Sequence, residues 1–152
     1  MKKLFTLLTI FLLVVSTEII SQPPVKDFVI VGLVSGDLNM VQIQMRYEGT
    51  PNVYFIKESS TSGFEQIANA IEGLKINDLH IYARSNSQEL ILSGIPINLK
   101  NVNDFTVQLN RWKDCVSGKV IVHIASSNTS PEITNLLLKM EELSALEIKA
   151  LQ

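Results

Sequence analysis

Apolar and polar residues alternate along the chain in blocks that predict strands and helices in turn. Short runs with the length and composition of buried strands lie at residues 28–33, 53–56, 78–83 and 120–125. The run at 28–33 is continuously apolar, which is typical of a strand that is covered on both faces. A last short strand is predicted at 146–150.

Between these runs the apolar residues recur at helical spacing. The predicted helix faces are formed by Leu38, Val41 and Met45; by Phe64, Ile67, Ala68, Ile71 and Leu74; by Val102, Phe105, Leu109 and Trp112; and by Ile133, Leu136, Leu137, Met140 and Leu143. Ser62 and Glu65 have the spacing of a capping box, and Ser130 followed by Pro131 has the pattern of a helix start. Gly118 is predicted to end the third helix before the next strand.

A small hairpin is predicted where residues 89–92 and 95–98 flank Ser93 and Gly94, and Pro96 suits an edge strand. Strands that alternate with helices predict an α/β fold, with a mainly parallel sheet and helices on both faces. Ligands of such sheets bind beyond the carboxyl ends of the strands. The pattern therefore directs attention to segments 84–88 and 126–130.

The first residues have the pattern of a secretory signal. Two lysines precede an uncharged apolar run over residues 4–15, which is shorter than the roughly 20 residues that a transmembrane helix needs. We favour cleavage after Ser21 over cleavage after Ser16. The prediction is a signal peptide at 1–21, a short extended leader at 22–26 and a single α/β domain at 27–152. The protein is then exported, to the periplasm, the cell surface or the medium.

Composition narrows the choice of partners. The net charge is −2 without a polybasic run, so nucleic acid is not an expected partner. Cys115 is the only cysteine, so the chain has no internal disulfide. Two histidines on different strands give no metal-ligand spacing, and we expect neither a metal nor a cofactor. No later stretch is long and apolar enough for a membrane span after signal removal.

The motifs at the predicted strand ends resemble a known family. The sequences LHIYARS at 79–85, ELIL at 89–92 and VHIAS at 122–126, in this order of elements, resemble the caspase-like domain of unknown function found near the N-terminus of large bacterial surface proteins with cadherin-like repeats. The resemblance covers about residues 27–151. It implies a caspase-like three-layer sandwich, as in the cytosolic caspases and the secreted gingipains.

The resemblance also implies where a catalytic dyad would lie. In the family one strand typically ends in a His-Gly pair and the next in a Gly-Cys pair, and these fall here on Arg84-Ser85 and Ala125-Ser126. Arginine stays protonated and cannot act as a general base. A serine hydroxyl needs a positioned base before it can attack. The resemblance therefore implies a pseudo-peptidase that lacks the dyad.

Other side chains are poor substitutes for the missing dyad. His80 and His123 lie inside predicted strands, where a hydrogen-bonded structural histidine is the expected interpretation. Cys115 precedes a strand and is expected at the opposite edge of the sheet. Residues 128–130 fit a glycosylation sequon, but we interpret Ser130 as a helix cap.

The sequence is compatible with three functions. The first is a non-catalytic, surface-associated binding module, whose cleft is edged by Arg84, Ser85, Ser126, Ser127 and Asn128. There Arg84 would bind a carboxylate, an extended peptide or a protein partner, or else it would only fill space or pair with Glu89. The second is a weak serine hydrolase that uses Ser126. The third is a remnant of a larger bacterial adhesin.

Overall fold

A computed structural model of the chain describes residues 23–32, 38–124 and 129–151. The strands are β1 (Val25–Gly32), β2 (Val53–Ile56), β3 (Ile76–Ser85), β4 (Leu90–Ile91), β5 (Lys119–Ile124) and β6 (Glu147–Leu151). The helices are α1 (Leu38–Tyr47), α2 (Gly63–Ile71), the 3-10 turn η1 (Val102–Phe105), α3 (Thr106–Cys115) and α4 (Pro131–Ser144). The predicted signal peptide and the predicted site residues Ser126, Ser127 and Asn128 lie outside the described residues.

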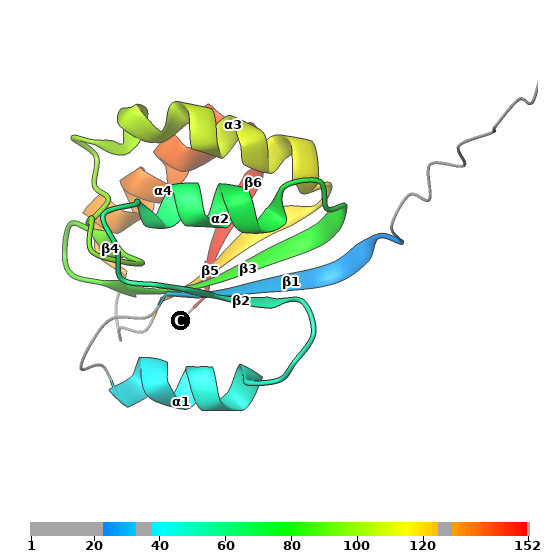
Figure 1. Cartoon of the computed structure of the whole chain (residues 1–152). Helices are drawn as coiled ribbons and strands as arrows, with labels where there is room; N and C mark the ends of the chain where they lie inside the picture. Colours follow the sequence, from blue (N-terminus) through cyan, green and yellow to red (C-terminus); the bar gives the residue numbers. More distant parts are fainter. Residues whose placement is uncertain (1–22, 33–37, 125–128, 152) are drawn as a thin grey trace, which may run out of the picture.

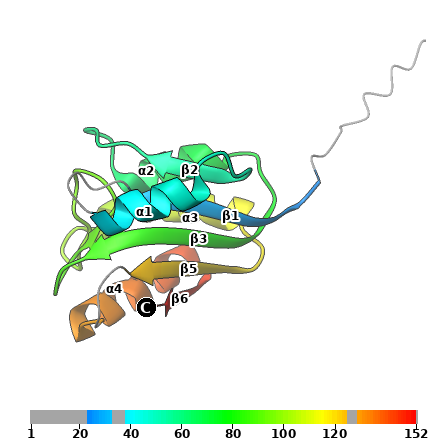
Figure 2. The ribbon, with the colours of Figure 1, turned by 90° about the horizontal axis from the view of Figure 1, so that it is seen from below.

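Five parallel strands form the sheet in the order β2-β1-β3-β5-β6, and β4 pairs antiparallel with β3 (Figure 1). Helix α1 lies on one face, whereas α2, α3 and α4 cover the other (Figure 1). Figure 2 looks onto the α1 face and shows α1 over β1 and next to β3, with β5 and β6 further away. This arrangement confirms the predicted mainly parallel α/β fold with helices on both faces.

The main core lies between the sheet and the three helices on one face. Alternate strand residues point into this core, for example Leu79, Ile81 and Ala83 of β3, because successive side chains of a strand point to opposite faces. Phe64 and Trp112 are fully buried there, and their rings meet edge to face with centroids 5.0 Å apart. The predicted faces of α2 and α3 thus meet each other as well as the sheet.

The predicted helix starts of α2 and α4 are confirmed. The Ser62 hydroxyl accepts a hydrogen bond from the backbone N–H of Glu65, and the Ser130 hydroxyl accepts one from Ile133. Each satisfies a backbone donor that the first helical turn leaves unpaired. No helix in the described part of the chain has the length and apolar character to cross a membrane.

Three boundaries differ from the sequence-based prediction. Strand β1 begins at Val25, inside the segment 22–26 predicted as a leader, because its backbone bonds to Lys75. Strand β3 runs on through Arg84 and Ser85, since β4 pairs with both of them. The predicted hairpin at 89–98 is reduced to a single bridge between Leu90 and Ile97.

Candidate functional site

The carboxyl ends of β3 and β5 lie at the same edge of the sheet. The two strands are parallel neighbours, and Ala83 near the end of β3 pairs with Ile124 at the end of β5. After β5 the described chain resumes at Thr129, and the Ser130 hydroxyl donates a hydrogen bond to the backbone oxygen of Ser87. The two segments that the sequence singled out therefore meet at Ser87 and Ser130.

Arg84 and Ser85 are the last two residues of β3 and do not share one face. Strand alternation puts Arg84 on the α1 face, with His80 and Tyr82, and Ser85 on the opposite face. Arg84 is exposed and Ser85 is half-buried. The two side chains therefore do not edge the single cleft that the sequence predicted. Arg84 is the one that faces solvent.

The turn between β3 and β4 is held by asparagine side chains. The Asn86 amide oxygen accepts hydrogen bonds from the backbone N–H of Gln88 and of Glu89, at 2.8 Å each. The Asn86 and Asn98 amides in turn donate to the two oxygens of the Glu89 carboxylate, at 2.9 and 3.1 Å. These bonds, the one from Asn86 first, lower the pKa of Glu89, so the carboxylate stays ionised.

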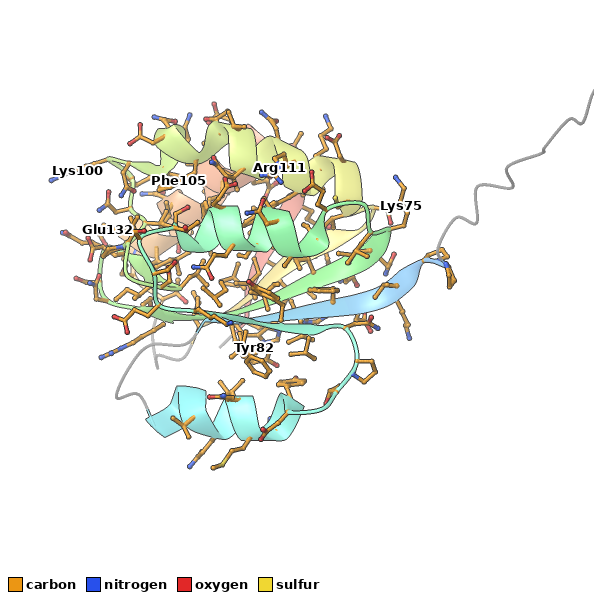
Figure 3. All side chains as sticks on the ribbon, in the orientation of Figure 1. Lys75, Tyr82, Lys100, Phe105, Arg111 and Glu132 are labelled. Carbon is orange, nitrogen blue, oxygen red and sulfur yellow. The ribbon has the colours of Figure 1, made fainter. Side chains whose placement is uncertain are left out.

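A cavity of about 280 Å³ lies beside this turn. Its lining comes from the β3–β4 turn, the segment after β4 and the first turn of α4: Gln88, Glu89, Asn98, Leu99, Lys100 and Glu132. Figure 3 labels Lys100 and Glu132 at this end of the molecule. Carboxylates, amides and an ammonium in one cavity suit a polar ligand better than an apolar one.

Cys115 lies at the opposite end of the sheet from this cavity, as predicted. It is the last residue of α3, and it lines a separate cavity with Gly73 and Lys75, just before β3. Burial raises the pKa of the Cys115 thiol and outweighs the opposing hydrogen bond with the Gly73 backbone. A raised pKa leaves less of the reactive thiolate. Residues 23–32, 38–124 and 129–151 hold no cluster of three metal-ligating side chains.

The two histidines contact each other, which the sequence pattern did not predict. His80 Nδ1 and His123 Nε2 are 2.9 Å apart, on adjacent strands and on the α1 face of the sheet. The predicted structural role is thus met by one imidazole bonding to the other. The sequence correctly predicts that each histidine lies in a strand. It does not predict their contact, because the register of β3 against β5 is what makes them diagonal neighbours.

A family model described as a domain of unknown function (DUF4347) matches residues 37–152, from just before α1 to the end of β6. The chain belongs to this family. The DUF4347 match includes β3, the β3–β4 turn and α4, which together surround the cavity. It shows no relation to caspases or gingipains, so that part of the resemblance stays a prediction. Comparison with curated proteins and with solved structures finds no match.

Ser130→Ala is expected to lower the free energy of unfolding by about 1–2 kcal/mol, because it removes the N-cap of α4. It also removes the hydrogen bond to Ser87, so amide exchange at 86–89 should become faster. Urea unfolding and hydrogen exchange measure the two effects.

The matched control is Ser62→Ala, which removes the N-cap of α2 and has no hydrogen bond to the β3–β4 turn. It should cost a similar amount of stability and leave exchange at 86–89 unchanged. Equal exchange at 86–89 in the two variants would mean that Ser130 does not hold the turn.

Proposed function

We propose that this exported DUF4347 domain is a non-catalytic module of the caspase-like type that binds an extended peptide at the carboxyl edge of β3 and β5. The observation that carries the proposal is that the carboxyl ends of β3 and β5 lie side by side. The hydrogen bond from Ser130 to Ser87 joins the segments that follow the two strands. Ligands of parallel α/β sheets bind at this edge.

Arg84 supports recognition of a carboxylate. It is exposed at the end of β3, where the caspase-like resemblance would require a general base. Its guanidinium keeps its proton at ordinary pH and offers a planar fork of donors that fits both oxygens of a carboxylate. The side chain is therefore suited to bind an acidic side chain or a free peptide C-terminus, and unsuited to accept a proton.

The cavity beside the β3–β4 turn supports a polar peptide as the ligand. The ionised Glu89 and the nearby Glu132 and Lys100 offer charges of both signs to side chains of the ligand. The backbone that lines it is fixed by Asn86 and Asn98, so little conformational freedom would be lost on binding.

The histidine pair is evidence against a serine hydrolase that uses Ser126. The facing nitrogens of His80 and His123 are bonded to each other at 2.9 Å inside the sheet. A base that activates a serine must reach its hydroxyl directly or through one water. We expect a fluorophosphonate probe to leave Ser126 unlabelled.

Arg84→Ala is expected to weaken binding of carboxylate-bearing peptides roughly 10- to 100-fold, because a charge-assisted bidentate contact is worth about 1.5–3 kcal/mol. The measurement is fluorescence polarisation with a peptide library in which each member is made with a free and with an amidated C-terminus. Arg84→Lys keeps the charge without the fork and should fall between the natural chain and Arg84→Ala.

Lys113→Ala serves as the control, since Lys113 is an exposed cation on α3, away from this edge. The proposal fails if Arg84→Ala leaves every detected affinity unchanged. It also fails if mass spectrometry shows that the natural chain cleaves any of the peptides, whereas cleavage by the double variant Arg84→His plus Ser126→Cys alone would support an intact peptide-binding cleft.

A further inference from the structure

His80 and His123, the only two histidines of the chain, form one hydrogen-bonded pair. The ring centres are 5.2 Å apart and the facing nitrogens 2.9 Å apart, with 22° between the ring planes. The two nitrogens therefore lie between the rings and point at each other. In such a bond one nitrogen carries the proton and the other accepts it.

Two tyrosines link this pair to α1. The Tyr82 ring stacks on the His123 ring, with centroids 4.2 Å apart and planes 8° from parallel. The Tyr82 hydroxyl is 3.0 Å from the hydroxyl of Tyr47, the last residue of α1. Figure 3 shows Tyr82 on the side of the sheet that faces α1. Burial and then the Tyr47 hydrogen bond raise the pKa of Tyr82 to about 12, so this hydroxyl keeps its proton.

None of the described side chains of α1, those of residues 41–47, is fully buried. Helix α1 is the one described helix on its face of the sheet (Figure 1). Two of its apolar residues point outward, since Val41 is 40% and Met45 70% exposed. A helix that leaves apolar side chains in solvent gains less from burial than α2, whose apolar face is buried. Tyr47 joins α1 to the sheet through its hydroxyl and through its ring, whose centroid lies 5.6 Å from that of Tyr82.

The number of protons on the pair decides whether the His80–His123 bond exists. With no net charge, or with one shared extra proton, one of the facing nitrogens still accepts. With two extra protons both facing nitrogens are donors, and two cations stand 2.9 Å apart. Burial, and then the charge of His80, lower the pKa of His123 from its ordinary value of 6.5.

Other charged and titratable groups lie on the same face of the sheet as the pair. From the described strands and α1 they are Asp27, Arg46, Tyr47, Asp78, Tyr82, Arg84, Lys119, Glu147 and Lys149. Glu147 and Lys149 bond to each other at 2.7 Å. His80 is the charged group that acts on the pKa of His123.

We propose that the His80–His123 pair is a proton-sensitive latch, which releases α1 from the sheet when both imidazoles are protonated. Protonation of the second ring turns an attraction into a repulsion, and the rings separate. His123 then leaves its stacked position on Tyr82, and Tyr82 loses the support that aims its hydroxyl at Tyr47. Helix α1 is thereby freed without unfolding of the main core, which lies on the opposite face.

The direction of the pH effect follows from proton binding. The form with α1 docked disfavours the charged His123, so the released form binds more protons. Docking is complete above about pH 6.5, the ordinary value for histidine, and it is lost as the pH falls from there through the lowered pKa of His123. Each pKa unit of difference between the two forms changes the docking equilibrium about tenfold.

The test is hydrogen exchange on the natural chain between pH 7.5 and pH 4.5 (about three units, enough to span the titration of a histidine). Exchange is expressed as protection factors, which remove the intrinsic pH dependence of the chemistry. The protection of α1 should fall several-fold with acid, whereas α2 and α3 keep theirs. In His123→Gln, which keeps a hydrogen-bonding side chain that does not titrate, α1 protection should be independent of pH.

Imidazole titration by NMR on the natural chain tests the latch even if His123→Gln folds poorly. The expected result is a shared proton, with the last protonation of the pair below the ordinary histidine range. Tyr47→Phe should lower α1 protection at neutral pH and, because docking and proton binding are linked, should move the last protonation of the pair up toward the ordinary histidine range. The latch is wrong if the two imidazoles titrate independently in the ordinary range, or if α1 protection falls equally with acid in His123→Gln.

Discussion

Trp112→Ala is expected to cost about 3–5 kcal/mol of the free energy of unfolding, the largest loss of any single change considered for this chain. Trp112 is fully buried, and its ring meets the edge of Phe64 with the planes 73° apart. Phe64 in turn packs edge-on against Phe105 at 5.5 Å. Truncation leaves a cavity between α2, η1 and α3, and these packed elements cannot easily move together to close it. Urea unfolding followed by far-UV circular dichroism measures the loss.

Trp112→Phe is the matched control. It keeps an aromatic ring against Phe64 and removes the indole N–H, which is buried and finds no hydrogen-bond partner in the described part of the chain. Loss of an unpaired buried donor offsets part of the lost packing, so the cost should stay below about 1.5 kcal/mol. A cost for Trp112→Ala under about 1 kcal/mol would show that α3 is not packed as the structure has it.

The elements of the fold could be predicted because burial imposes a period on the sequence. A strand covered on both faces is apolar at successive positions, as at 28–31, and a helix against a sheet must repeat its apolar residues every three or four positions, as from Phe105 to Trp112. These periods depend only on the local chain. The boundaries were less accurate, because the ends of β1 and β3 are set by strands that pair with them from elsewhere.

The candidate site could be predicted only in part, since its geometry comes from contacts between distant segments. The parallel arrangement predicts that Ser87 and Ser130 lie at one edge, and they bond. The cavity was missed because its lining comes from three segments that become neighbours only when β4 folds back on β3. The same holds for His80 and His123, whose contact depends on a register that sequence spacing does not reveal.

The two proposals meet on β3. Strand alternation puts Arg84 on the same face as Tyr82, two residues away, so the proposed carboxylate contact and the latch share one strand and one face. Release of α1 would expose this face next to Arg84. Peptide binding measured at pH 7.5 and at pH 5 (a roughly two-unit interval across the histidine range) would therefore report whether the latch acts on the binding edge.

Gly118→Ala is expected to cost about 2–3 kcal/mol, the second large loss, because the residue lies against β3 with no room for a side chain. A Cβ at Gly118 would stand 2.5 Å from the backbone oxygen of Asn77 and would also press on the Asp78 carboxylate. The Gly118 N–H donates to that same Asn77 oxygen, and Asp78 accepts from the N–H of Lys119. The added methyl group therefore forces apart the bonds that start the β3–β5 pair.

Gly94→Ala is the control for Gly118→Ala, because its Cβ would make only an ordinary contact, 3.4 Å from the Ser59 backbone oxygen. Thermal unfolding should show a clear loss for Gly118→Ala and little change for Gly94→Ala. The sequence pattern predicts only that Gly118 ends a helix. Alanine is a far better helix former than glycine, so helix propensity alone would not predict a loss of stability for Gly118→Ala. If Gly118→Ala costs no stability, β5 does not begin as close to β3 as the structure has it. The contact at Gly118 would then not be what sets the register that pairs Ala83 with Ile124.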